Sequence, residues 1–142
     1  MYFPPYSQLL QSTKNGADSG HVTLSIELFN FLLQTALATV DFDEANYLAA
    51  NPDIRSNLAK TRELTPAQHF IGYGYFEGRR GGMPKVDEQW YLQTYRDVAQ
   101  AVQNGQIGSA TEHFEIIGAA EGRAPSKEYL DVAKQWKRLL KL

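Results

Sequence analysis

Residues 69–79 read HFIGYGYFEGR, and residues 113–123 read HFEIIGAAEGR. Six of the eleven positions are identical, and the two stretches lie 44 residues apart. Five upstream identities keep the same interval: Asp43 with Asp87, Glu44 with Glu88, Tyr47 with Tyr91, Leu48 with Leu92, and Asp53 with Asp97. Eleven identities in one register are not expected by chance, so the sequence predicts a tandem repeat.

The repeat signature comprises one aspartate, one histidine and a glycine-containing turn that ends in arginine. Its residues are Asp53, His69, Gly74, Glu77, Gly78 and Arg79 in the first copy and Asp97, His113, Gly118, Glu121, Gly122 and Arg123 in the second. Arginine is a planar, multiply donating group that suits a carboxylate. We therefore expect each arginine to fold back on the aspartate of its own repeat or on exposed helix-end carbonyls.

The third helix of each copy is predicted to start with a capping box. Thr65 and Gln68 have the right spacing, with a proline at the first helical position. Ser109 and Glu112 provide the same pattern with different residues. Gly74 is expected to end the third helix of the first copy in a left-handed conformation.

The first helix of each copy is predicted to start at an aspartate cap, Asp43 or Asp87. In the first copy Asn51 precedes Pro52, which predicts a second helix capped by the asparagine with proline at its first position. Tyr95-Arg96 replaces this pair in the second copy.

The stretch 22–40 is the most apolar of the chain, and we expect a long helix from Ser25 as its N-cap. Glu27, Asn30 and Gln34 fall on one narrow stripe of that helix, and they argue against a membrane span. The apolar surface covers about two thirds of the circumference and needs partners on several sides.

A second copy of the same helix is the expected partner. The candidate self-association residues are Phe29, Leu32, Leu33 and Ala36. Such a patch is larger than soluble monomers usually expose, and two-fold pairing is the commonest way to cover one. We therefore expect a homodimer.

The C-terminus is basic, with five Lys/Arg against two acids from Lys127 onward and nine against fourteen in the remainder. A helix capped by Ser126 is expected. Its apolar stripe is Tyr129, Val132, Ala133, Trp136, Leu139 and Leu140, and its basic residues are Lys127, Lys134, Lys137, Arg138 and Lys141. Three interpretations stay open: the Trp136 stripe docks on the core, the helix lies on an anionic membrane surface, or it contacts nucleic-acid phosphates.

No catalytic, cofactor or metal site is predicted. His69 and His113 are equivalent, but a zinc site needs three or four ligands, and neither of the usual histidine spacings occurs. We expect each imidazole to pack in the fold and to bond a backbone carbonyl. The glycines at 72 and 74 do not have dinucleotide-binding spacing, and the neighbouring aromatics would crowd a phosphate.

The fold class expected is all-α. Residues 1–142 are predicted to form a single domain with four parts: an N-terminal arm and apolar helix over 1–40, the repeats over 41–84 and 85–125, and a basic amphipathic helix over 126–142. A 43% hydrophobic and 21% charged composition is typical of a globular protein, and a net charge of −2 argues against general nucleic-acid affinity. The chain has no cysteine, and residues 1–5 do not resemble a secretory signal, so cytoplasmic residence is expected.

The duplicated unit resembles a short bacterial repeat of the form Tyr-Leu-x-x-Asn-Pro-Asp-Val, then His-Phe or His-Tyr, then Gly and Glu-Gly-Arg. Tyr47-Leu48, Asn51–Ile54 and the 69–79 stretch fit this form, whereas Tyr95-Arg96 departs from it. Such repeats occur in large bacterial surface or calcium-binding proteins and beside glycosyltransferase-type domains. The resemblance covers residues 41–125 and implies an accessory module linked to surface polysaccharide, with no catalytic residues to carry over.

The expected function is a non-enzymatic module for protein interaction and assembly. Two other classes stay open, an accessory domain or subunit of a polysaccharide-synthesis enzyme and a nucleic-acid-binding regulator that uses the basic C-terminal helix. Convergent polar groups in a deep pocket would favour the enzyme, whereas a broad exposed apolar surface would favour the interaction module.

Overall fold

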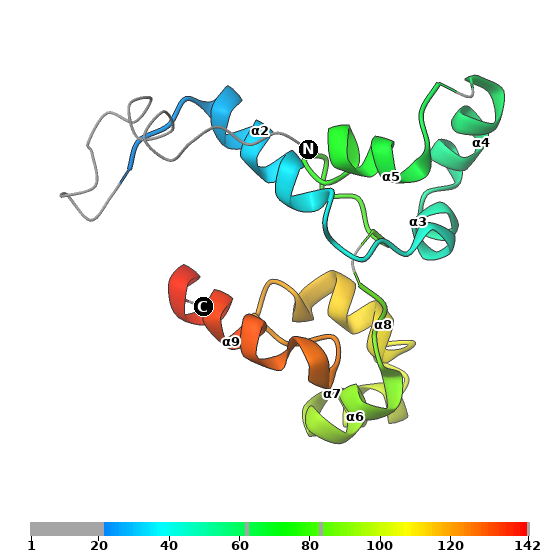
Figure 1. The fold of residues 1–142 in the computed structure, drawn as a ribbon. Helices are drawn as coiled ribbons and strands as arrows, with labels where there is room; N and C mark the ends of the chain where they lie inside the picture. The colour runs from blue at the N-terminus through cyan, green and yellow to red at the C-terminus, as the bar shows by residue number, and fades with distance from the viewer. Residues whose placement is uncertain (1–21, 62, 83, 142) are drawn as a thin grey trace. The chain divides into compact units, whose positions relative to one another are not determined.

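The computed structural model describes residues 22–61, 63–82 and 84–141. These residues form helices joined by loops and contain no strand (Figure 1). The predicted all-α fold class is therefore confirmed for this part of the chain. The N-terminal arm over residues 1–21 lies outside it.

The chain divides into two compact units, Met1–Thr39 and Val40–Leu142, whereas the sequence predicted one domain. The division falls at the predicted start of the first repeat. Its physical basis is helix α2 (Ile26–Leu37), which belongs to the first unit and buries none of its residues.

Helix α2 begins directly after Ser25, as predicted. The Ser25 hydroxyl accepts a hydrogen bond from the Leu28 amide at 3.2 Å, which satisfies one of the free donors of the first turn. The helix is twelve residues long and ends at Leu37, so it is shorter than the long helix expected to reach Val40. The Thr39 hydroxyl donates to the Ala36 carbonyl at 2.7 Å and closes the last turn.

The second unit contains two successive sets of helices. The first set is α3 (Glu44–Ala50), α4 (Pro52–Thr61), α5 (Pro66–His69) and the π-helical segment η2 (Phe70–Gly74). The second set is α6 (Glu88–Thr94), α7 (Arg96–Gln103), α8 (Ala110–His113) and the π-helical segment η3 (Phe114–Gly118). Each element of the second set begins 44 residues after its counterpart, as at 88 against 44 and 114 against 70.

The predicted aspartate caps are confirmed. The Asp43 carboxylate accepts from the Asn46 amide at 3.0 Å, and the Asp87 carboxylate accepts from the Trp90 amide at 3.0 Å. Both aspartates place a negative charge at a helix N-terminus, where the helix dipole favours it. The first helix of each set therefore starts for the same reason.

The capping box is complete in the first set and half formed in the second. The Thr65 hydroxyl accepts from the Gln68 amide, and the Gln68 side chain accepts from the Thr65 amide. Ser109 accepts from the Glu112 amide at 3.0 Å, but the Glu112 carboxylate accepts from the Gly108 amide instead of closing the box.

Asn51 does not cap α4 through its side chain, so that prediction is wrong. Its side-chain amide donates to the carbonyls of Tyr47 at 2.8 Å and Arg80 at 2.9 Å. Asn51 is buried, and these two bonds satisfy its amide group. The side chain therefore ties the end of α3 to the segment that follows Arg79.

Aromatic and aliphatic side chains of the second set form a buried cluster. Its buried members are Val86, Tyr91, Val98, Ala110 and Phe114. Tyr91 and Phe114 pack edge to face with ring centroids 6.1 Å apart, a geometry that aromatic pairs favour. Tyr47, Ile54 and Phe70 are the buried residues at the corresponding positions of the first set.

The C-terminal segment forms a short 3₁₀ helix, η4 (Lys127–Tyr129), followed by α9 (Leu130–Leu140). Ser126 precedes η4, but its side chain makes no capping hydrogen bond, contrary to the prediction. No residue of α9 is buried. Among the described residues, the Trp136 stripe is exposed and does not pack on the core of the second unit. Among the residues that the structure describes, no helix has the length and apolar character to cross a membrane.

Candidate functional site

A tyrosine–histidine pair lies at the centre of each helix set. The Tyr91 hydroxyl lies 3.0 Å from Nδ1 of His113, and the Tyr47 hydroxyl lies 2.9 Å from Nδ1 of His69. Both tyrosines are fully buried, so each hydroxyl needs an internal partner. The predicted backbone-carbonyl partner of the histidines is thus wrong, since Nδ1 faces a tyrosine hydroxyl.

A glycine allows each tyrosine to reach its histidine. A Cβ on Gly118 would clash with the Tyr91 hydroxyl and lie 3.2 Å from Nδ1 of His113. Gly74 meets the Tyr47 hydroxyl in the same way. These glycines are required for close approach and not as left-handed helix ends, which corrects the prediction for Gly74.

The left-handed position lies four residues later in each copy. Gly78 and Gly122 both have a φ of 68°. The amide of the following arginine then donates to the glycine carbonyl at the end of the π-helical segment, at 2.9 Å for Arg79 to Gly74 and for Arg123 to Gly118. This turn directs each arginine back over its own helix set.

The predicted arginine–aspartate pairs are confirmed in both copies. Arg123 binds Asp97 through two parallel bonds, Nη1 to Oδ1 at 3.0 Å and Nη2 to Oδ2 at 2.7 Å. Its Nε also donates to Glu121 at 2.6 Å, and its guanidinium lies 5.0 Å from the centre of the Tyr95 ring. Two carboxylates and an aromatic face therefore hold one guanidinium.

Arg79 makes a looser version of the same cluster. One nitrogen, Nη1, contacts Asp53 at 2.9 Å and Asn51 at 3.3 Å, while Nε donates to Glu77 at 2.6 Å. The side chain of Arg79 is 26% exposed and that of Arg123 is 19% exposed. The second cluster therefore holds its arginine more tightly.

Position 51 and its counterpart 95 connect to the same segment by different chemistry. Asn51 donates its amide to the Arg80 carbonyl, whereas the Tyr95 hydroxyl accepts from the Ala124 amide at 2.9 Å. Arg80 and Ala124 are also 44 residues apart. Aligning the two copies showed only that Tyr95 differs from Asn51. The link itself was not visible, because two different side chains make it and the residues at the two positions are not identical.

Burial and the arginine fix the charge state of the second cluster. Burial lowers the pKa of His113 below its usual value of 6.5, and the nearby Arg123 charge acts in the same direction. Burial raises the pKa of the Tyr91 hydroxyl. The hydrogen bond from Arg123 lowers the pKa of Asp97. At neutral pH a neutral Tyr91–His113 pair thus lies beside a charged Arg123–Asp97 pair, an arrangement suited to holding helices together.

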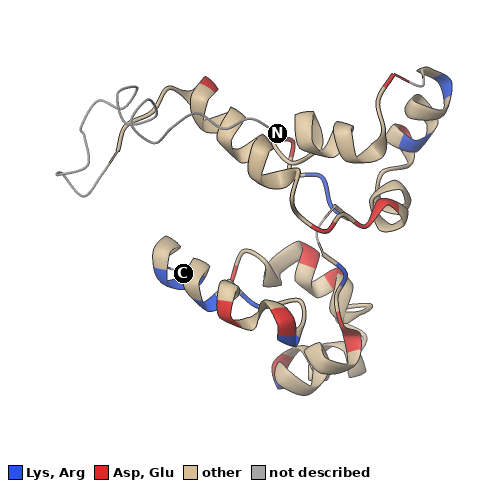
Figure 2. Cartoon of the chain, viewed as in Figure 1, with Lys and Arg blue, Asp and Glu red and all other residues tan. Residues whose placement is uncertain are grey.

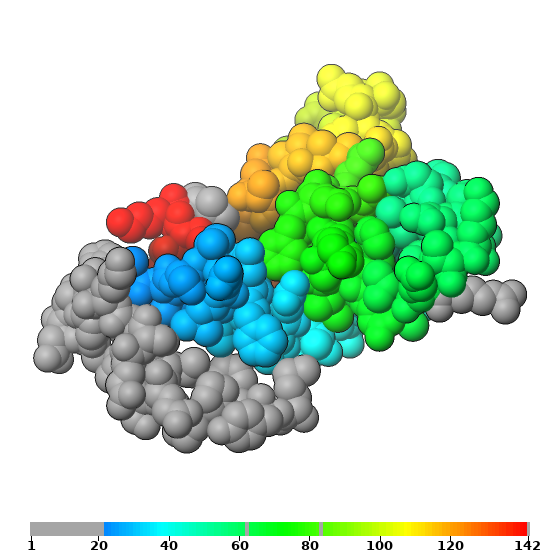
Figure 3. All heavy atoms as spheres, turned by 90° about the horizontal axis from the view of Figure 1, so that it is seen from above, coloured from blue at the N-terminus to red at the C-terminus, as the bar shows by residue number. Residues whose placement is uncertain are grey.

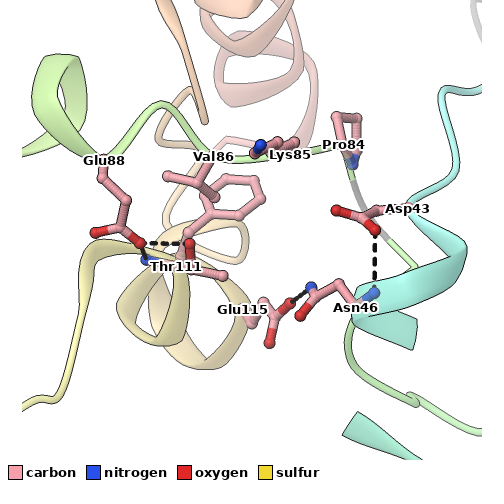
Figure 4. A pocket seen from close by; sticks show the side chains of 9 residues that line it. Asp43, Asn46, Pro84, Lys85, Val86, Glu88, Thr111 and Glu115 are labelled. Carbon is pink, nitrogen blue, oxygen red and sulfur yellow. Dashed lines mark hydrogen bonds between the residues drawn. The ribbon is translucent and has the colours of Figure 1, made fainter. Parts of the chain in front are cut away.

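A pocket of about 210 Å³ lies within the second unit (Figure 4). Its lining residues are Asp43, Asn46, Pro84, Lys85, Val86, Glu88, Thr111, Phe114 and Glu115. Figure 4 shows Glu88 and Thr111 on one side and Asp43 and Asn46 on the other, with Glu115 directed at Asn46. The Asn46 side chain donates to Glu115 at 2.7 Å.

The acidic side chains of this pocket already serve the fold. Asp43 caps α3. Glu88 accepts from the amides of Ala110 at 3.0 Å and Thr111 at 2.9 Å, so it caps α8. These carboxylates face helix ends and do not converge on the cavity. The sequence analysis missed the role of Glu88, although an acid matched in both copies at position 44 or 88 was a signal.

The candidate self-association surface is only partly covered. Phe29 is 46% exposed and Ala36 is exposed, whereas Leu32 and Leu33 are half-buried. Phe31, which the sequence analysis did not select, is 61% exposed. At about 100° per residue Phe31 lies on the side of α2 opposite Phe29. The helix therefore presents apolar side chains on two sides.

In the described part of the chain no group of three or more His, Asp or Glu side chains is placed to hold a metal ion. No family model, curated protein or solved structure matches this chain.

Proposed function

We propose that the chain is a non-enzymatic module for protein assembly, built from two tandem helical repeats and dimeric through α2. The observation that carries this proposal is that α2, which is mostly apolar, buries none of its residues. Exposing such a helix to water is unfavourable. Two-fold pairing covers it with the same helix of a second chain, so that no other binding surface is needed.

The face proposed for pairing contains Phe29, Leu32, Leu33 and Ala36. These residues recur at three- and four-residue spacing and form one stripe. Asn30 and Gln34 lie at its border and set the register of the two helices by hydrogen bonding. The opposite face, which carries Phe31, remains free for a second protein.

The repeats supply a rigid support in this proposal. Each set is held by a hydrogen bond between a buried tyrosine and a histidine and by an arginine–carboxylate cluster. Asp43 and Glu88 at the pocket cap helices and Glu115 binds Asn46, which supports a scaffold over a catalytic role. The resemblance to bacterial surface-protein repeats supports a role for such a scaffold in surface-polysaccharide assembly, as an accessory factor.

Light scattering behind a sizing column tests the pairing. The full chain at micromolar concentration is expected to have the mass of a dimer. Phe29→Ser combined with Leu33→Ser is expected to give a monomer, because it places hydroxyls in the paired stripe. Phe31→Ser is the matched control, since it removes an equally large exposed side chain from the opposite face.

A monomeric full chain would contradict the dimer, and equal dissociation by Phe31→Ser would contradict the chosen face. Catalytic turnover by the purified chain would contradict the non-enzymatic role. Co-purification from the native host then identifies the second protein.

A further inference from the structure

Helix α9 carries an exposed apolar stripe. Val132 is 46% exposed, Trp136 56%, Leu139 58% and Leu140 59%. At about 100° per residue these four side chains fall within one arc of about 100°. Figures 1 and 3 show the last turns of α9, in red, projecting away from the helices of the second repeat. The stripe is therefore a continuous surface and not a set of scattered residues.

Four cations occupy the remaining surface of the same helix and its C-cap. They are Lys134, Lys137, Arg138 and Lys141. Asp131 is the single acid of α9, and Lys134 contacts it at 3.4 Å. Figure 2 shows the basic residues gathered toward the C-terminal end of α9. The helix thus has a net charge opposite in sign to that of the chain as a whole.

This combination fits an anionic lipid surface. Tryptophan and leucine on one side of a helix and lysine and arginine on the other allow it to lie at the boundary between headgroups and acyl chains. Lysine and arginine stems follow the apolar side while their charges reach the phosphates. A bilayer accepts a straight apolar stripe without a groove of matching shape.

A second copy of the chain is a poorer partner for α9. Pairing two α9 helices through this stripe would turn the cations of both helices away from the contact and leave them without an anionic partner. The pocket of the second unit is lined by Asp43, Glu88 and Glu115, but their carboxylates already bind helix N-termini or Asn46. This pocket of a second copy therefore offers no free carboxylate for the cations of α9.

We propose that α9 docks on anionic membranes, with Trp136, Leu139 and Leu140 inserted at the interface and Lys134, Lys137 and Arg138 bound to lipid phosphates. The proposal does not depend on pairing through α2. It predicts reversible, salt-sensitive binding of the kind that one short amphipathic helix provides.

Sedimentation of the full chain with lipid vesicles tests this. We expect binding to vesicles of phosphatidylcholine mixed with phosphatidylglycerol and little binding to phosphatidylcholine alone. Replacing Lys134, Lys137 and Arg138 with Gln is expected to weaken binding about a hundredfold, at roughly fivefold for each cation near the surface. The combined change of Arg55, Lys60 and Lys85 to Gln alters net charge equally and is expected to have far less effect.

The apolar side has its own variant and control. Trp136→Ser with Leu139→Ser is expected to abolish sedimentation, while Ile116→Ser, at an exposed residue of the second repeat, leaves it unchanged. Binding should also shift the tryptophan emission of the native chain to shorter wavelength, and Trp136→Phe should remove that shift.

Absence of binding to anionic vesicles at low salt would overturn the proposal, as would binding that the α9 variants leave intact. If the α9 variants changed the oligomeric mass of the protein in the absence of vesicles, the partner of the α9 stripe would be a second copy of the chain. Equal or tighter salt-sensitive binding to duplex DNA would assign the helix to nucleic acid.

Discussion

At the scale of single residues, Arg123 joins three parts of the second repeat. It bonds Asp97 at the start of α7, Glu121 in the turn before it, and the ring face of Tyr95 between α6 and α7. Arg79 holds the equivalent groups through fewer atoms. Because guanidinium geometry allows two parallel bonds to one carboxylate, the second cluster has the stronger pair.

Replacing Arg123 with Ala is expected to lower the free energy of unfolding by about 1–2 kcal/mol, a value reduced for the exposure of Asp97. Arg79→Ala is expected to cost less. Urea denaturation followed by circular dichroism measures both. Equal stability of wild type and Arg123→Ala, with loss of a binding partner instead, would show that the arginine is a recognition residue.

His113 makes stability depend on pH. Its pKa in the folded chain lies below the ordinary value of 6.5. The unfolded chain therefore binds the proton first as pH falls, so the neutral histidine's contribution is complete above pH 6.5 and is lost as pH falls through the folded pKa. NMR titration should show the His113 ring titrating below 6.5. A midpoint at or above that value would contradict the prediction.

At the scale of helices, most of the predicted caps are present, although those expected from Asn51 and Ser126 are not. Ser25, Asp43, Thr65 and Asp87 each accept from an amide three residues ahead, and a local spacing of this kind can be read from the sequence. Links across the sequence could not be predicted in this way. The Arg–Asp pairs were predicted because both residues are matched between the two copies. The Tyr–His pairs were not predicted, because they depend on how α3 packs against α5.

Glu88 is the cap that joins two helices, and removing it should loosen α8 in particular. Glu88→Ala leaves the amides of Ala110 and Thr111 without their carboxylate partner. We expect a loss of about 1 kcal/mol, and faster hydrogen exchange at these two amides than elsewhere. Gln89→Ala, at the exposed neighbouring position, is the control. Uniform exchange changes across both repeats would contradict a local role.

At the scale of the whole molecule, the division at Thr39 and Val40 separates the two proposed activities. The sequence predicted the start of the first repeat at residue 41 inside a single domain, because an apolar helix is read as part of a core until its burial is known. Exposure of α2 and α9 is a property of packing, and local sequence pattern alone does not give it.

Residues 40–142 are therefore expected to fold without the first unit. A fragment of this range should keep the helical circular dichroism and the unfolding midpoint of the second unit, since all the clusters of the repeats lie inside it. It should also be monomeric if α2 mediates pairing. Loss of cooperative unfolding in the fragment would contradict the division.

The links at positions 51 and 95 have a consequence for the history of the gene. In one copy the side chain gives a hydrogen to a carbonyl, and in the other it receives one from an amide. Unequal crossing-over that joined residue 51 to the segment around 124, or residue 95 to the segment around 80, would change the backbone group that each side chain now binds. Each side chain would then have to bond through its other function, the amide oxygen of Asn51 or the hydroxyl hydrogen of Tyr95. Exchanges that carry each residue together with its own partner segment keep the present bond. Duplication of a whole helix set would therefore add a copy in which this link is already matched.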